Sequence, residues 1–466
     1  MTIAQTSIDT LRKNLRGSVI VAGDPAYDEG RRVWNAMIDK RPAVIARCRG
    51  AVDVMAAVRF ARHEGLSIAV RGGAHNVAGR ATCDDGIVID LSGMKGIRVD
   101  PVARTARAEP GLRWGEFDRE TQAFGLATTG GTIGDTGIAG LTLGGGFGWL
   151  GGRFGMTVDN LLAADIVLAN GELVQASATD NPDLFWAIRG GASNFGVVTS
   201  FEYRLHPVGP MIVGGLVIHP FARATEALKF YGQFMRSAPD DLTAAAVLMT
   251  GPDGQKACAI AAAYSGTVDD GVKALQPLKE FGPPVFDIIG PMPYVGQQSL
   301  LDQAMPPNLL NYWKADFIDG MSDDLISVAV DAHSRVPSPR SSILFFPIHG
   351  AASRVAPDAT AYPHRHGIHM GIYSLWEDVV ENEPNIAWVR ETWAAIQPHT
   401  AGGVYVNELG DDEGDDRVKL AYAGNYARLA TIKAQYDPDN LFHLNANIKP
   451  DQSAAPALRA ATGSSV

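Results

Sequence analysis

One short segment combines residue types that could hold an anion with one that could bond to a cofactor. Residues 71–79 (RGGAHNVAG) follow an apolar run at 67–70, which predicts a short buried strand. The small residues after Arg71 can crowd backbone N–H groups around an anion, because glycine adopts positive φ and lacks a Cβ. Arg71 adds a fixed positive charge, and His75 adds an imidazole. The pattern is typical of a cradle for the phosphates of a nucleotide cofactor, and the alternative is a tight turn with an incidental histidine.

A second segment, residues 130–155, holds twelve glycines in twenty-six residues. An interior glycine costs a helix or strand about 0.5–1 kcal/mol, so this density favours a backbone that lies against a large flat group. Residues 146–151 (GFGWLG) match the GxGxxG pattern of dinucleotide-binding folds. A true site of that kind lies between a strand and a helix, whereas this one follows glycines and precedes a poor helix start. We therefore reject a Rossmann site.

The elements around these segments follow from hydrophobic periodicity. A strand at 43–47, a helix at 51–63 and a strand at 66–70 predict a β-α-β unit that leads into the cradle. Residues 189–194 (RGGASN) repeat the cradle pattern with Ser193 in place of His75. Other expected elements are strands at 86–91, 97–100, 105–109 and 196–205, helices at 114–124 and 181–188 (capped by Asp180), and a hairpin of 162–169 with 172–176 around Asn170-Gly171.

Length and composition limit the class of protein. A chain of 466 residues predicts two domains, and a net charge of −11 without a basic block argues against a nucleic-acid partner. Three widely spaced cysteines fit a reducing compartment. The start of the chain lacks the apolar core of a signal peptide, and no run reaches the roughly 20 apolar residues of a membrane span. We expect a cytoplasmic protein.

The second half of the chain has a different character. Pro207 and Pro210 mark an expected domain boundary, and residues 211–401 alternate strands with helices, which favours an antiparallel sheet backed by helices. The acidic run at 411–416 predicts a solvated loop. A helix is expected at 423–436, and the residues after Asp451 are expected to fray.

Four motifs together identify a family. RGGAHN at 71–76, TGIAGLTLGGGFGWL at 136–150, WAIRGGASNFGVVTSF at 186–201 and PDNLFHLNANI at 438–448 resemble the berberine-bridge-enzyme-like FAD oxidases of the vanillyl-alcohol-oxidase superfamily. The resemblance implies an α+β fold. Its parts would be a PCMH-type FAD-binding domain within 1–208, a substrate domain at 209–404 and a C-terminal segment at 405–466 that returns to the FAD domain.

The resemblance also implies a covalent bond from His75 to the 8α-methyl group of the flavin, which needs a neutral imidazole. Many relatives have a second bond, from a cysteine eleven residues before the GGG, where this chain has Ile133. We therefore expect one covalent link. Thr136 matches the position at which relatives gate oxygen. From the glycine-rich segments and the resemblance together, we expect the flavin site to contain Arg71, Gly72, Gly73, Ala74, His75, Asn76, Gly79, Thr136, Gly137, Gly140, Gly145, Gly148, Val197, Tyr405, Asn445 and Asn447.

Candidates for substrate chemistry lie on two segments that the resemblance implies are strands. In one, Tyr405 and Asn407 would face one way and Glu408 the other. Relatives often have tyrosine where Glu408 stands, so the identity of the base stays open. In the other, His369 and Tyr373 share a face, with core packing an equally weighted alternative. His364, His366 and His369 also invite a metal reading, but the companion spacing of a zinc site is missing, so we expect no metal.

The expected function is oxidation of a small organic alcohol, amine or phenol by hydride transfer to flavin N5, with O₂ as acceptor and H₂O₂ as product. The alternatives are a flavin dehydrogenase with another acceptor, an NADPH-dependent reductase with loosely held FAD, and a non-catalytic flavin-binding protein. Neither the substrate nor the oligomeric state follows from the sequence.

Overall fold

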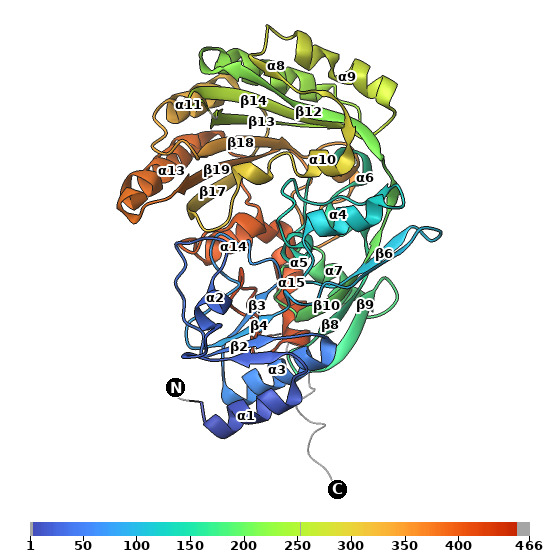
Figure 1. Ribbon diagram of the computed structural model, residues 1–466, viewed down its shortest axis with the longest axis vertical. Helices are drawn as coiled ribbons and strands as arrows, with labels where there is room; N and C mark the ends of the chain where they lie inside the picture. The colour runs from blue at the N-terminus through green and yellow to red at the C-terminus, as the bar shows by residue number, and fades with distance from the viewer. Residues whose placement is uncertain (1–2, 252, 454–466) are drawn as a thin grey trace.

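The computed structural model describes residues 3–251 and 253–453, which form an α+β fold with three large sheets and one two-stranded ribbon. Figure 1 shows the largest sheet in the upper half of the molecule and the two smaller sheets in the lower half. The fold class expected from the sequence is confirmed. Within the described ranges, no helix has both the length and the apolar composition needed to cross a membrane.

The first sheet contains the β-α-β unit predicted from the sequence. Helix α3 (Ala51–Glu64) buries Val54, Ala57, Val58 and Ala61 on one face and ends at Gly65, which has a φ of 67°. The helix connects parallel strands, and the second of them leads directly into the loop at 72–79. The strands, in spatial order, are β1 (Ser18–Ile20), β2 (Val44–Arg47), β4 (Ile87–Asp90) and β3 (Ile68–Arg71).

The second sheet is antiparallel and contains the predicted hairpin, whose strands pair from Ala163–Ser177 to Val167–Leu173. Its order is β5 (Ile97–Asp100), β6 (Thr105–Ala108), β10 (Val197–Arg204), β8 (Leu161–Val167) and β9 (Leu173–Ser177). The prediction that Asp180 caps the next helix is wrong. Helix α7 (Pro182–Ile188) begins after Asn181, which adopts a φ of 47°, and Asp180 instead accepts hydrogen bonds from Ser177 and Thr179.

The third sheet is antiparallel, and helices cover its outer face, as predicted for the second half of the chain (Figure 1). Successive side chains along its strands point to opposite faces of the sheet. One face packs against the helices, and the other faces the lower half of the molecule. Their order is β15 (Phe286–Asp287), β12 (Met211–Pro220), β14 (Lys256–Tyr264), β13 (Leu242–Thr250), β18 (Ser342–Pro347), β19 (Ile368–Trp376) and β17 (Leu310–Ile318), with β16 (Gly290–Pro293) also paired to β12. The covering helices are α8 (Ala224–Arg236), α9 (Val268–Glu280), α11 (Asp323–Ser334) and α13 (Asn382–Ile396).

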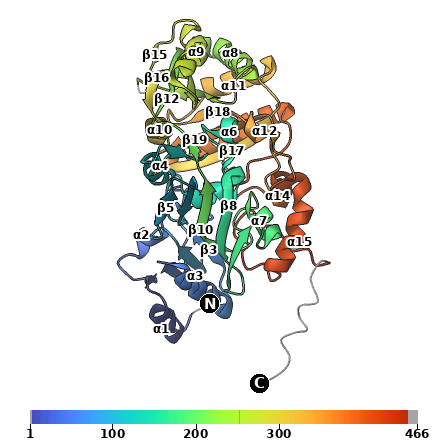
Figure 2. The same cartoon turned by 90° about the vertical axis from the view of Figure 1, so that its right-hand side faces the viewer.

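The C-terminal segment returns to the lower half, where α14 (Asp415–Tyr422) and α15 (Tyr426–Tyr436) lie along one side (Figure 2). Lys433, which is fully buried, ties α15 in place by donating to Asp437 at 2.6 Å and to the carbonyl of Asn194 at 2.6 Å. The acidic run is not simply solvated, because Asp412 and Glu413 both pair with the buried Lys314. The fraying expected after Asp451 falls mainly on residues outside the described ranges.

Shorter elements complete the described chain. They are α1 (Gln5–Asn14), α2 (Tyr27–Arg31), α4 (Trp114–Gln122), α5 (Ile138–Leu143), α6 (Gly151–Phe154), α10 (Tyr294–Gln298), α12 (Ala351–Arg354) and the ribbon of β7 (Leu126–Ala127) with β11 (His206–Pro207).

Candidate active site

One large cavity of about 1220 Å³ lies between the glycine-rich loops of the lower half and the inner face of the third sheet. Typical sites for small ligands occupy about 300–1000 Å³, so this cavity has room for a large cofactor and a substrate together. Many of the predicted cofactor and substrate residues thus meet in one space, whereas His369, which is buried, does not line it. Those that line it are Gly72, Gly73, Ala74, His75, Asn76, Thr136, Gly137, Gly140, Tyr373, Tyr405, Glu408 and Asn445.

The cradle loop lies against the second glycine-rich segment, backbone on backbone. A Cβ on Gly73 would come within 2.6 Å of the Gly137 Cα, and one on Gly137 within 2.7 Å of the Gly73 Cα, so neither position tolerates a side chain. The left-handed conformation belongs to Ala74, at a φ of 58°, and the related loop repeats it at Ala192, at 55°. The glycines therefore serve close approach, while an alanine makes the turn.

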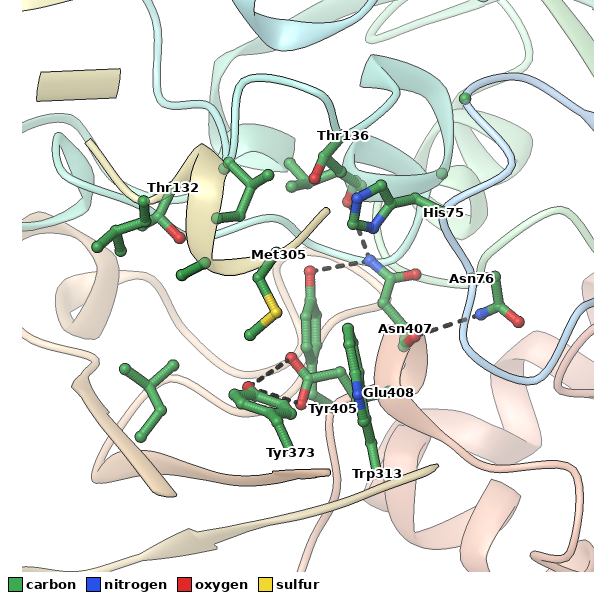
Figure 3. A pocket seen from close by; sticks show the side chains of 18 of the residues that line it. His75, Asn76, Thr132, Thr136, Met305, Trp313, Tyr373, Tyr405, Asn407 and Glu408 are labelled. Atoms are coloured by element: carbon green, nitrogen blue, oxygen red, sulfur yellow. Dashed lines mark hydrogen bonds between the residues drawn. The ribbon is translucent and has the colours of Figure 1, made fainter. Parts of the chain in front are cut away.

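His75 lies at the edge of this cradle and faces the cavity (Figure 3). Its ring stacks on Trp34 with the centroids 4.3 Å apart, and its buried Nε2 has no hydrogen-bond partner among the residues that the structure describes. Burial, with a smaller contribution from Arg113, lowers the pKa of His75 to about 4, so the imidazole is neutral at pH 7. A neutral ring with an unengaged nitrogen is suited to bonding with an electrophilic carbon.

Two predicted cofactor residues point away from the cavity because they lie on the other face of a strand. Arg71 donates to the carbonyl of Gly30 and lies 4.0 Å from Asp90, so its charge is not in the cradle. Val197 packs in the core of the first sheet, whereas its neighbour Val198 lines the cavity. These predictions had the right strands but the wrong faces.

Three predicted glycines pack against protein instead of lining the cavity. A Cβ on Gly79 would meet Ile38, one on Gly145 would meet Tyr362, and one on Gly148 would meet the carbonyl of Gly130. The glycine density at 130–155 is therefore largely a requirement of tight chain packing. Asn447 also lies off the cavity, whereas Asn445 lines it and donates to the Ser193 carbonyl at 3.0 Å.

The residues at 405–408 do not form the expected strand. Val406–Glu408 is a single 3₁₀ turn, which places Glu408 on the cavity beside the third sheet. The carboxylate of Glu408 accepts hydrogen bonds from the Tyr373 hydroxyl at 3.1 Å and from His369 Nε2 at 3.1 Å. Figure 3 shows the Tyr373 hydroxyl pointing toward the Glu408 carboxylate at the wall of the cavity. All three residues were candidates from the sequence, but their contact with one another was not predicted, because they lie on separate segments and the turn reads as a strand.

Tyr405 lines the same wall and is held by neighbours of the glycine-rich segment. Its hydroxyl oxygen accepts from Asn407 Nδ2 at 2.8 Å and from the Gly146 N–H at 3.2 Å. Burial raises the pKa of Tyr405 and also that of Tyr373, so both hydroxyls stay protonated at neutral pH. Each is therefore a hydrogen-bond donor, and the ionisable acceptor that faces the cavity at this point is Glu408.

Comparison with known proteins assigns the family. A family model described as "FAD binding domain" matches residues 42–177, and one described as "Berberine and berberine like" matches residues 404–449. The chain is 33% identical over 447 residues to an FAD-linked oxidoreductase of Dictyostelium discoideum, across 95% of this chain and 96% of that relative. The chain belongs to the berberine-bridge-like family of FAD-linked oxidoreductases.

Other members of the family illustrate its range. The structure of 6-hydroxy-D-nicotine oxidase from Arthrobacter nicotinovorans superposes with a TM-score of 0.88 and 27% identity, over 97% of this chain and all of that one. A xylooligosaccharide oxidase of Thermothelomyces thermophilus is 26% identical over 96% of this chain and 95% of its own. By their names, these berberine-bridge-like proteins act on chemically different substrates.

The described residues fit the FAD that this family binds. Cavity size, the side-chain-free contact of Gly73 with Gly137 and the unpartnered Nε2 of His75 all suit a flat group with a phosphate-bearing tail. Cys48, Cys83 and Cys258 are buried, and none of them lines the cavity, so the position of Ile133 has no substitute thiol. Arg80 lines the cavity where Arg71 was expected, and burial lowers its pKa.

Two of the three histidines that invited a metal reading are engaged elsewhere, and the third, His366, is exposed. His364 contacts the Ala421 carbonyl at 3.1 Å and stacks on Phe317, while His369 is paired with Glu408. Among residues 3–251 and 253–453, no group of three or more histidine, cysteine or carboxylate side chains is arranged to hold a metal ion.

Proposed function

We propose that this berberine-bridge-like protein holds FAD through a single covalent bond from the His75 imidazole and oxidises an organic alcohol, amine or phenol. The flavin supplies hydride acceptance at N5 and re-oxidation by O₂, which yields H₂O₂. The observation that carries the proposal is the buried, unpartnered Nε2 of His75 in a neutral ring at the cavity wall.

The proposal gives the cavity residues separate roles. Backbone groups of Gly72, Gly73 and Ala74 with the side chain of Arg80 hold the phosphates, because the cradle and this cation line the same cavity. Thr136 lies on that wall with a small side chain, which leaves space for O₂ to approach. The small side chain at Thr136 favours an oxidase over a dehydrogenase.

Glu408 is the base in this proposal, and Tyr373 and His369 are positioning residues. A base must lie within hydrogen-bonding reach of the proton it takes, and Glu408 is the carboxylate that lines the cavity next to Tyr405. The hydrogen bonds from Tyr373 to Oε1 and from His369 to Oε2 hold the carboxylate in a fixed orientation. Glu408 would take a proton from the substrate hydroxyl or amine.

Anaerobic mixing tests the reaction. The yellow protein is mixed without oxygen with panels of alcohols, amines, phenols and sugars, and flavin absorbance is followed. We expect one panel to bleach the flavin, and admission of air to restore the colour with one H₂O₂ per flavin. A bleached protein that stays reduced in air would make it a dehydrogenase instead, and a flavin that no panel bleaches would favour a non-catalytic role.

A further inference from the structure

The substrate side of the cavity has an unusual floor, built from the inner face of the third sheet. Strand β14 places four alanines on this face, at 257, 259, 261 and 263, whereas Cys258, Ile260 and Tyr264 pack under the helices on the other face. The flanking strands β12 and β13 carry larger side chains on the same inner face, among them Ile218 and Val247. Small residues between larger ones form a trough along β14.

The strand register shows that this floor crosses the sheet to the candidate base. Ile218 lies opposite Ala259, Ala259 opposite Val247, Val247 opposite Leu344 and Leu344 opposite Gly371. Four steps between strands at about 4.8 Å make this row about 19 Å long. Gly371 is two residues from Tyr373 on the same face, so the row ends where Tyr373 donates to Glu408.

The segment at 300–305 adds mainly apolar side chains to the cavity lining, with Gln303 as its polar member. Leu300 and Leu301 pack against the same buried cluster as Leu216 and Leu344, while Met305 packs against the cluster that contains Tyr373. Figure 3 shows the Met305 side chain between the Thr132 and Thr136 side of the cavity and the Tyr373 side. At the outer end of the row, Ile218 lies opposite Phe286, which is 48% exposed. The ion pair of Arg340 with Glu377 lines the cavity beside β18 and β19, on the Tyr373 side.

Side-chain polarity along the row selects between substrate classes. None of Ile218, Ala259, Val247, Leu344 and Gly371 carries a polar side-chain atom, so hydroxyl groups lying on them would lose water without gaining a partner. An oligosaccharide has such hydroxyls along its whole length. A hydrocarbon chain or fused ring system gains from burial on this floor.

We propose that this trough binds the apolar body of the substrate, with its reacting hydroxyl or amine at the Glu408 and Tyr373 end. The substrate class is thus an elongated hydrophobic alcohol or amine and not a sugar. The assignment of the reacting end rests on the proposed function, whereas apolar binding in the trough does not.

Binding to the resting holoenzyme tests the proposal without turnover. Calorimetric titrations use 1-butanol, 1-hexanol, 1-octanol and 1-decanol, with cellobiose as the polar probe. We expect Kd to fall about two- to fourfold for each added methylene, and cellobiose to show no binding. A Kd that is independent of chain length, or cellobiose binding tighter than 1-decanol, would overturn the proposal.

Two variants locate the binding site. Val247→Thr keeps the shape of the side chain and adds a hydroxyl to the floor, so we expect the Kd of 1-decanol to rise about fivefold. Ala259→Phe fills the trough and should abolish 1-decanol binding, whereas Ala103→Phe, on an exposed turn, should leave it unchanged. An unchanged Kd in Val247→Thr would place the alcohols elsewhere and contradict the proposal, and this variant decides the matter if Ala259→Phe does not fold.

Failure of the proposed function gives a different pattern. Chain-length-dependent binding without bleaching by any alcohol or amine would support apolar binding in the trough and contradict the oxidase assignment. Bleaching by a sugar together with cellobiose binding would support the oxidase assignment and contradict the proposal that the trough selects an apolar substrate.

Discussion

The two walls of the cavity are built in different ways. The lower wall is mainly backbone, where Gly73 and Gly137 touch and Ala74 turns the chain. The upper wall is mainly side chains, contributed by strands from β12 to β19 that pair across the sheet. A backbone wall can be the same in many relatives while a side-chain wall changes freely. We infer that the lower wall serves the shared FAD and that the upper wall determines which substrate binds.

The largest expected effect is on the lower wall. His75→Ala removes the nitrogen that we propose as the covalent anchor, so acid-precipitated protein should be colourless, although the native variant still binds FAD through the cradle. The measurement is flavin absorbance in the acid pellet. His63→Ala, whose side chain is 84% exposed, is the matched control and should keep its colour. An acid-stable flavin in His75→Ala would refute the anchor.

The next effect is on the upper wall. Glu408→Gln keeps the shape and removes the charge of the proposed base, so kcat should fall about 10²- to 10⁴-fold while flavin content stays constant. Stopped-flow measurement of anaerobic flavin bleaching checks this. Glu383→Gln changes an exposed carboxylate on α13 and should leave the rate unaltered. A rate close to wild type in Glu408→Gln would assign the proton transfer elsewhere.

The junction between the two walls is expected to respond to pH. Asp118 on α4 is fully buried. One of its oxygens accepts a hydrogen bond from Gln298 on α10 at 2.8 Å, and the other has no partner within residues 3–251 and 253–453. Burial raises the pKa of Asp118 to about 7 from 3.8, so the folded state holds its proton more tightly than the unfolded state. The contribution of Asp118 to folding stability is therefore most favourable below about pH 4 and is lost as the pH rises to about 7.

Asp118→Asn removes this dependence, so the variant should gain about 2–4 kcal/mol over wild type at pH 8 and little at pH 4. Thermal unfolding at the two pH values provides the measurement, with the exposed Asp319→Asn as control. An equal effect of Asp118→Asn at both pH values would show that its carboxyl does not titrate between folded and unfolded states.

The smallest effect tests the contact within the lower wall. Gly137→Ala puts a methyl group 2.5 Å from the Gly73 nitrogen, which should cost about 1–3 kcal/mol of stability and loosen FAD binding. Gly151→Ala lies in the same glycine-rich segment with open space at its Cβ and should be neutral. Flavin retention during gel filtration compares the two. Equal retention would mean that the loops separate easily.

The difference between the walls also explains which predictions succeeded. The β-α-β unit and the hairpin depend on neighbouring residues, so local patterns were sufficient to predict them. The faces of strands and the conformation of turns were harder to predict. Arg71 and Val197 point away from the cavity while their neighbours Val70 and Val198 line it, and residues 406–408 form a 3₁₀ turn. The apolar row was not predictable at all, because its register joins residues from 218 to 371.

Peptide mass spectrometry of the wild-type holoenzyme tests the role of His75 most directly. Trypsin should release residues 72–80, which contain a single histidine, between Arg71 and the bond after Arg80. We predict that this peptide carries the mass of FAD, with fragment ions that place it on His75. A yellow protein whose peptide 72–80 is unmodified would contradict the covalent anchor.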